Sequence, residues 1–317
     1  MLEASAIPDR ARARAWPALP LTEWQDTLDT LHRYLQIVGK TRLALAPSVN
    51  HCWQVTLYLT SRGLTTSPMP CDDRTVEIEL DFIDHRLLGR ASDGATSAMP
   101  LLPRTVADFY CDYTALLESL GVRAPIWPVP CEMPDDLPFT RDHLHGSYDA
   151  DYAGRCWQIL SQSDRVFQRF RCRFLGKCSP VHFFWGAFDL ACTRFSGRKA
   201  PPHPGGVPHL PDRVVREAYS HECISAGWWP GNAGGPVAEP AYYSYCYPEP
   251  PGYPDATVLP RGAYYHRDLK EFVLPYQLVR ASDQPDEVLL QFLQSTYEAA
   301  ANLAGWDRAA LEHPRPG

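Results

Sequence analysis

Histidines and carboxylates in the second half of the sequence could bind a metal ion. His182 opens an apolar, strand-like segment, and His203 lies in a loop rich in proline and glycine. His221 directly precedes Glu222. Imidazole nitrogens, with a carboxylate from Asp189 or Glu222, are ligands that suit one transition metal ion such as Fe, Zn or Cu. The spacing matches no compact metal motif, so the alternative is that each histidine is a hydrogen-bonded structural residue.

Arginines beside small and hydroxyl residues could bind an anion. Arg194 and Arg198 flank a Ser-Gly pair, and Arg62 precedes a run of glycine, threonine and serine. Planar guanidinium groups in such surroundings suit carboxylate or phosphate recognition. The alternative is that each arginine pairs with a structural acid such as Asp84 or Asp189.

Aromatic residues could form the wall of a substrate pocket. They are concentrated between residues 228 and 265, interleaved with proline and glycine. Rigid rings provide contact area at little entropic cost, and phenol hydroxyls orient polar ligands. We expect Trp185 and Trp228 to contact the substrate. Tyr219, which lies close to His221 and Glu222 in the sequence, is a third candidate catalytic residue.

These residues predict an enzyme that acts on a small polar or anionic molecule, and one version of the prediction is metal-assisted. In that version His182 and His221 are ligands, and Asp189 or Glu222 is a carboxylate ligand or general base. A non-catalytic anion-binding protein that uses the same arginines and aromatic rings is the alternative. A scaffold whose histidines are all structural is the third interpretation.

Composition limits the class of protein. The chain has 317 residues, of which 45% are hydrophobic and 21% charged, so it can bury a large core. A formal net charge of -7 argues against a broad nucleic-acid interface. No apolar run is long enough to span a membrane, and ten scattered cysteines form no CxxC motif. We expect a cytoplasmic protein with reduced thiols and a small-molecule ligand, with no membrane or nucleic-acid partner; the oligomeric state stays open.

Hydrophobic periodicity predicts the elements that must position these residues. Helices are expected at 22–38, 105–120, 151–176 and 283–305, the first ending at Gly39. Strands are expected at 50–62, 75–84, 215–225, 241–247 and 272–280, and one strand is expected within 176–202. In a regular strand His182 and Asp189 would point to opposite faces, unless Gly186 hosts a bulge.

The order of these elements predicts an internal duplication. Aligning His51 with His182 places Leu59 over Leu190 and suggests two copies of about 140 residues. We therefore expect an α+β fold made of two helix, antiparallel-sheet and helix units, whose sheets join at their edges or close into a barrel-like core. The expected boundaries are a tail at 1–20, a first repeat at 21–148, a second repeat with the site at 149–312 and a tail at 313–317.

Several long segments resemble a known family. TSRGLTTSPMP, DFIDHRL, PRTVADFY, GKCSPVHFFWGAFDLACTRFSGR, EAYSHE and WWPG are similar to those of a bacterial family catalogued only as a domain of unknown function. The resemblance extends over nearly the whole chain, from about Trp16 to Leu311. It implies a recurring soluble fold and adds no reaction.

Overall fold

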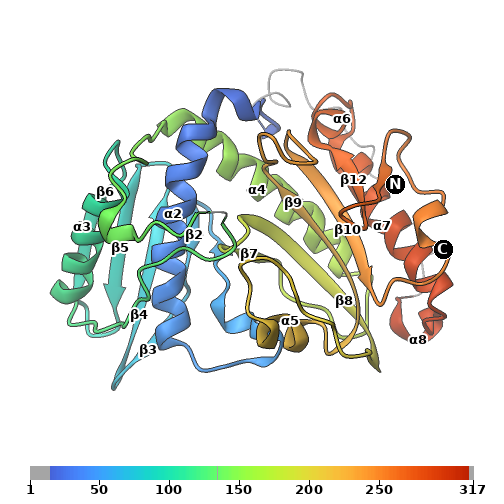
Figure 1. Ribbon diagram of the computed structural model, residues 1–317, viewed down its shortest axis with the longest axis horizontal. Helices are drawn as coiled ribbons and strands as arrows, with labels where there is room; N and C mark the ends of the chain where they lie inside the picture. Colours follow the sequence, from blue (N-terminus) through green and yellow to red (C-terminus); the bar gives the residue numbers. More distant parts are fainter. Residues whose placement is uncertain (1–14, 134, 314–317) are drawn as a thin grey trace, which may run out of the picture.

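The protein combines helices with two antiparallel sheets of six strands each (Figure 1). The computed structural model describes residues 15–133 and 135–313. Each half of the chain begins with a long helix, continues through six strands and then returns to helix. The predicted α+β class is therefore confirmed. The order of elements is the one that an internal duplication would produce, and the duplication itself stays a prediction.

The first half builds one sheet. It comprises α2 (Leu21–Leu45), the 3-10 helix η1 (Asn50–Val55), β1 (Tyr58–Leu59), β2 (Gly63–Thr65), β3 (Met69–Cys71), β4 (Arg74–Asp81), β5 (Arg86–Ala91), β6 (Thr96–Pro100), α3 (Val106–Ser119) and η2 (Phe139–Arg141). The strand predicted at 50–62 is wrong over its first part. His51 and Cys52 have φ values of 61° and 59°, which belong to left-handed backbone and interrupt any strand. His51 therefore does not open a strand as His182 does, and the predicted alignment of the two residues has no support from their local structure.

The second half builds the other sheet. It comprises α4 (Ala150–Arg171), β7 (His182–Phe184), β8 (Asp189–Lys199), α5 (Asp212–Ala218), β9 (His221–Trp229), β10 (Ala241–Tyr247), η3 (Tyr253–Asp255), β11 (Tyr264–His266), β12 (Glu271–Pro275), α6 (Tyr276–Arg280), α7 (Pro285–Leu303) and α8 (Arg308–Leu311). Its strand order is β11-β12-β10-β9-β8-β7. The strand predicted at 241–247 is confirmed. Those predicted at 215–225 and 272–280 are each partly helical.

The two sheets meet edge to edge at one backbone bridge. The N–H of Leu57 donates to the carbonyl of Phe183 at 2.9 Å, and the reverse bond has the same length. This bridge satisfies edge groups of β7 that would otherwise be unpaired. Among the described strands β6 and β11 lie at the far edges and do not pair, so the predicted barrel-like closure is wrong. The alternative prediction, two sheets joined at their edges, matches the bridge.

The segment from 182 to 199 is a hairpin and not a single strand. β7 and β8 pair in antiparallel fashion, with His182 opposite Ala191 and Phe184 opposite Asp189. Residues 185–188 form the turn between them. Partners in an antiparallel pair share a face, so the hairpin places His182 and Asp189 on the same face of the sheet. In one continuous strand the two side chains would have pointed to opposite faces.

Helices cover one face of the second sheet and leave the other to loops. α4 and α7 pack against each other and against strands β8, β9 and β10. Trp16 and Leu19, which belong to the predicted tail, are buried in the core, and the Tyr276 hydroxyl donates to the Pro17 carbonyl at 2.8 Å. None of the helices in the described ranges has the length and apolar character required to cross a membrane.

Helix α2 continues well past the predicted end at Gly39 because that glycine makes room for an indole. A Cβ atom at Gly39 would lie 2.3 Å from Trp185 Cδ1, closer than van der Waals contact allows. Trp185 also donates from Nε1 to the Val55 carbonyl at 2.6 Å. The indole therefore fastens the tip of the β7-β8 hairpin to α2 and to η1.

This packing predicts opposite effects for two helical glycines. Gly39→Ala should lower the free energy of unfolding by about 1–3 kcal/mol, because overpacking against Trp185 outweighs the helix propensity of alanine. Gly154→Ala in α4 is the matched control. Its nearest atom, the Phe82 carbonyl oxygen, would be 3.8 Å away, so this variant should be as stable as the wild type or up to about 1 kcal/mol more stable. Urea unfolding checks both, and equal effects would contradict the packing argument.

Candidate functional site

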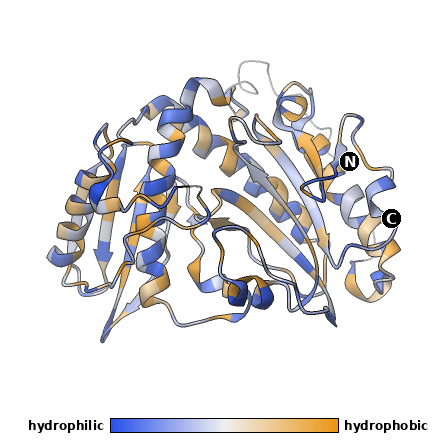
Figure 2. Cartoon of the chain, viewed as in Figure 1, coloured by the Kyte–Doolittle hydropathy of each residue, from blue (hydrophilic) through white to orange (hydrophobic). Residues whose placement is uncertain are grey.

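Acidic and phenolic side chains gather on the face of the second sheet that α4 and α7 do not cover. The register places Tyr243 opposite Gly227 and Tyr245 opposite Ser225, and Gly227 lies opposite Ala191. Strand β8 is mainly hydrophobic near its start and hydrophilic at its end (Figure 2). We define the carboxylate-tyrosine cluster by its members on this face: Asp189, Tyr219, Tyr243, Tyr245 and Glu271.

Asp189 is the most deeply placed acid of the cluster. It is 9% exposed, and its Oδ2 accepts a hydrogen bond from the Tyr243 hydroxyl. Gly227 permits this contact because a Cβ atom there would lie 2.4 Å from the Tyr243 ring. The pKa of Asp189 is raised to about 7, mainly by burial and also by the nearby Glu132 carboxylate, against the opposing effect of the Tyr243 hydrogen bond. This carboxyl group can therefore gain or lose a proton near neutral pH.

Glu271 supplies a second carboxyl group with a similar property. Glu271 is the first residue of β12 and lies at the same end of the cluster as Tyr245 of the neighbouring strand β10. Its side chain is half-buried. Burial raises the pKa of Glu271 to about 7, and the charge of Asp189 contributes in the same direction. No lysine or arginine of the described residues appears among the groups that shift either pKa. The two acids thus share a site without a compensating cation.

Tyrosine hydroxyls and rings complete the cluster. The Tyr219 hydroxyl donates to the Tyr245 hydroxyl at 2.9 Å, and the rings of Tyr243 and Tyr245 are stacked with centroids 6.1 Å apart. His203 stacks on Tyr219 with centroids 5.0 Å apart. The structure therefore brings together three of the residues predicted from sequence, namely Asp189, Tyr219 and His203.

His182 does not join this cluster. It is 1% exposed and lies against the rings of Trp53, Tyr58 and Phe184, at centroid distances of 5.5, 5.6 and 5.5 Å. Neither ring nitrogen has a hydrogen-bond partner among the described residues. Burial lowers the pKa of His182 to about 3, and the charges of two nearby arginines lower it further. At neutral pH this imidazole is uncharged.

The predicted pairing of His182 with His221 is absent from the described part of the chain. His221 has its own neighbours: Ser220 Oγ lies 3.1 Å from its Nδ1, and the ring of His51 lies 5.8 Å away. Within residues 15–133 and 135–313, no group of three or more histidine, cysteine or acidic side chains could hold a metal ion. The ligand set predicted from His182, His221 and His203 is therefore not assembled, and a bound metal stays a prediction.

Two of the predicted anion-binding arginines are paired with acids. Arg198 contacts Glu222 at 2.6 Å and also donates to the carbonyls that follow α7. Arg62 contacts Asp81 at 2.6 Å and Asp84 at 2.8 Å. These are the contacts expected for the structural alternative, and they also engage Glu222, which was a candidate general base.

The other predicted residues face away from the cluster. Arg194 is fully buried beside aromatic rings on the helix-covered face of β8. Trp228 is also fully buried and pairs with Leu190, a residue of that same face. Trp185 contacts Gly39 of α2. None of the three can contact a ligand at the cluster without a rearrangement of the core.

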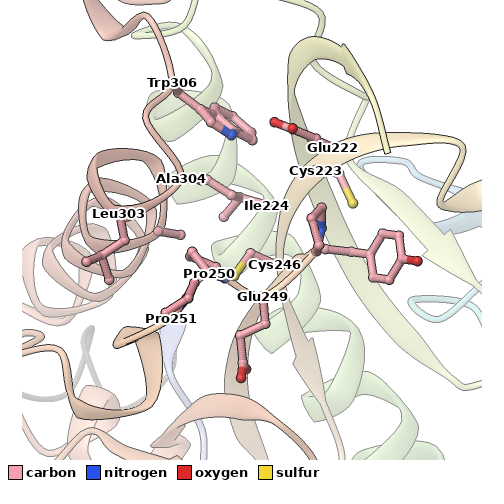
Figure 3. A pocket seen from close by; sticks show the side chains of 13 residues that line it. Glu222, Cys223, Ile224, Cys246, Glu249, Pro250, Pro251, Leu303, Ala304 and Trp306 are labelled. Carbon is pink, nitrogen blue, oxygen red and sulfur yellow. The ribbon is translucent and has the colours of Figure 1, made fainter. Parts of the chain in front are cut away.

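A separate small pocket lies between the end of the second sheet and α7 (Figure 3). Its volume is about 260 Å3, and its lining comprises Glu222, Cys223, Ile224, Cys246, Tyr247, Pro248, Glu249, Pro250, Pro251, Ala300, Leu303, Ala304 and Trp306. Of its two carboxylates, Glu222 is paired with Arg198, and Glu249 accepts from the Tyr265 hydroxyl. The pocket therefore offers mainly apolar surface, and its acids are already engaged.

Sequence reasoning missed Glu271, and it placed Tyr243 and Tyr245 only within the aromatic stretch 228–265 that was expected to form a pocket wall. The signal for the two tyrosines was the alternation in AYYSYCY, which places Tyr243, Tyr245 and Tyr247 on one face of a strand. The signal for Glu271 was a single acid at the start of the apolar segment EFVLP.

The fold and the cluster define a mixed α+β protein of two edge-joined antiparallel sheets, with an acidic, tyrosine-rich cluster on the face of the second sheet that α4 and α7 do not cover. The chain belongs to the Family of unknown function (DUF5996), whose profile matches residues 16–313. No curated protein and no solved structure matches the chain.

The raised pKa of Asp189 predicts a specific pH dependence of stability. Its folded-state pKa of about 7 exceeds the unfolded value, so the folded state binds more protons and loses stability as pH rises from about 4 to about 7. Asp189→Asn should remove this loss, which is on the order of a few kcal/mol. Urea unfolding at about pH 5 and about pH 8 measures it. Asp73→Asn, on an exposed turn, should keep the wild-type dependence; the same dependence in Asp189→Asn would contradict the assignment.

Two histidines should respond in opposite ways to replacement by phenylalanine. His182→Phe should raise the free energy of unfolding by about 1 kcal/mol, because it removes two buried nitrogens that make no hydrogen bond. His32→Phe should lower it by about 1–2 kcal/mol. The His32 Nε2 donates to the carbonyls of Trp185 and Gly186 at 3.0 and 2.9 Å, and these would lose their donor. Thermal and urea unfolding test the pair, and destabilisation by His182→Phe would show that its nitrogens have a partner in solution.

Proposed function

We propose that this protein is an enzyme that transfers a proton to or from a small polar molecule, with Asp189 as its acid-base group. The observation that carries the proposal is the Asp189 carboxyl, held by the Tyr243 hydroxyl, with a pKa raised to about 7 by burial. A group that titrates near the working pH is well matched to general acid-base catalysis. Strongly shifted acids that converge on one face of a sheet are also characteristic of functional sites.

The surroundings of Asp189 favour a neutral or cationic substrate over an anionic one. Glu271 adds a second acid, and stacked phenol rings present the negative faces that attract cations. The arginines first expected to bind an anion are engaged elsewhere, as the pairs of Arg62 and Arg198 illustrate. The cluster therefore carries acids without a free arginine among the described residues, and we propose a neutral or cationic substrate in place of the anionic one expected from the sequence.

Each member of the cluster has a role in this proposal. Asp189 accepts or donates the proton, and Tyr243 fixes the orientation of its carboxyl group. The hydroxyls of Tyr219 and Tyr245, which already contact each other at 2.9 Å, bind polar groups of the substrate. Glu271, whose own pKa is raised by burial and by the charge of Asp189, stabilises positive charge on the substrate. A metal ion would have to bind through ligands other than the predicted histidines.

A screen of metabolite-sized compounds tests both parts of the proposal. Ligand-observed NMR with cationic, neutral and anionic compounds should return hits from the first two classes. Asp189→Asn should weaken them about tenfold or more, while Asp73→Asn leaves them unchanged. Each hit is then incubated in D2O and followed by mass spectrometry for exchange or conversion. Turnover should fall by about 10²–10⁴-fold in Asp189→Asn.

The screen also distinguishes the main alternative. Hits that bind at the cluster without exchange or conversion would identify a non-catalytic binding protein. A set of hits that is predominantly anionic and insensitive to Asp189→Asn would contradict the proposed site.

A further inference from the structure

Two cysteines meet on the helix-covered face of β8, away from the carboxylate-tyrosine cluster. Residues 177–180 run antiparallel to β8: the N–H of Phe195 donates to the Lys177 carbonyl at 2.9 Å, and Cys178 forms a bridge with Arg194. Cys192 precedes Arg194 by two residues and so shares its face. The sulfur atoms of Cys178 and Cys192 lie 3.7 Å apart. A disulfide bond requires about 2.05 Å, so a small side-chain movement would join them.

The two thiols differ in exposure and acidity. Cys178 is partly exposed, whereas Cys192 is 1% exposed. A hydrogen bond with Cys192 lowers the pKa of Cys178 to about 7, and the charges of Arg194 and Arg171 lower it further against the effect of burial. Burial raises the pKa of Cys192 well above its ordinary value. An accessible, acidic thiol beside a buried, weakly acidic one is the arrangement of a nucleophilic and a resolving cysteine.

Arg194 explains why a thiolate is stabilised at this position. Its guanidinium lies 3.4 Å from the Phe170 ring centroid and 4.3 Å from that of Tyr297. Its Nη2 donates to the Phe170 carbonyl, but Nε and Nη1 have no hydrogen-bond partner among the described residues. On its far side the Tyr297 hydroxyl donates to Glu312. A buried cation is stabilised by nearby negative charge, and a thiolate at Cys178 would add to the charge of Glu312, which also interacts with Arg194.

We propose that Cys178 and Cys192 are a redox-active dithiol that reacts with small-molecule disulfides. The Cys178 thiolate attacks one sulfur of the disulfide RSSR, which forms a mixed disulfide and releases RS⁻. Cys192 then loses its proton and attacks the Cys178 sulfur, which closes the protein disulfide and releases the second RS⁻. In balance, two protein thiols are oxidised and one RSSR is reduced to two RSH.

The same charges make the protein disulfide easy to reduce. The thiolate is stabilised by Arg194 and Arg171 only in the reduced form, because the disulfide carries no charge. Stabilisation of the reduced form raises the reduction potential. The pair therefore fits reversible oxidation better than a permanent structural cross-link.

Disulfide mapping with oxidised glutathione tests the proposal. The reduced protein is freed of reductant, incubated with oxidised glutathione, digested without reduction and analysed by mass spectrometry. The wild type and the control Cys111→Ser should yield a peptide linked through Cys178 and Cys192. Cys192→Ser should accumulate glutathione on Cys178, whereas Cys178→Ser should leave Cys192 unmodified. Linkage of either thiol to a different cysteine, or no linkage between them, would overturn the proposal.

Labelling rates provide an independent readout of the thiolate. Iodoacetamide should label Cys178 at neutral pH about tenfold or more faster than exposed Cys111. The labelling rate of Cys178 should rise with pH and reach half of its maximum near the pKa of this thiol, which is about 7. Arg171→Gln removes one of the stabilising charges and should move the midpoint to higher pH. Equal labelling of Cys178 and Cys111 across the pH range would refute the nucleophilic role even if the fold is intact.

Discussion

Two backbone hydrogen bonds between Leu57 and Phe183 hold the β7-β8 hairpin at the junction of the two sheets, and much of the structure depends on the position of that hairpin. Without them β7 would present unpaired backbone groups at the centre of the molecule, where no other described strand covers its outer edge. The hairpin tip is fixed independently, by the Trp185 indole against Gly39 and by its bond to the Val55 carbonyl. Strand β8 therefore leaves the junction in one defined orientation.

Strand β8 carries different chemistry on its two faces because side chains alternate along a strand. Asp189 points to the loop-covered face, where Tyr243 and Glu271 complete an acidic site. Cys192 and Arg194 point to the helix-covered face, where the rings of α4 and α7 surround the guanidinium. One strand thus carries the proposed proton-transfer site on one face and the proposed dithiol on the other.

Both sites are governed by the cost of burying charge. Burial raises the pKa of Asp189 and of Glu271 to about 7, and a nearby carboxylate acts in the same direction on each: Glu132 on Asp189, and Asp189 on Glu271. At the thiol pair the direction is reversed: the hydrogen bond with Cys192, together with the charges of Arg194 and Arg171, lowers the pKa of Cys178 to about 7. Burial next to an acid raises the pKa of Asp189, and nearby arginines help to lower the pKa of Cys178, so that both groups have a pKa of about 7.

The sequence by itself determined the α+β class, the helix that begins after Thr105 and the strand at 241–247, because periodicity and capping are local properties. Only the tertiary structure decided that 182–199 is a hairpin, that α2 runs through Gly39, and that His182 and His221 lie apart. Only tertiary structure brings Glu271 toward Asp189, and Cys178 against Cys192. These outcomes depend on which strands become neighbours and which charges they enclose, and such long-range pairings leave no periodic signal in the chain.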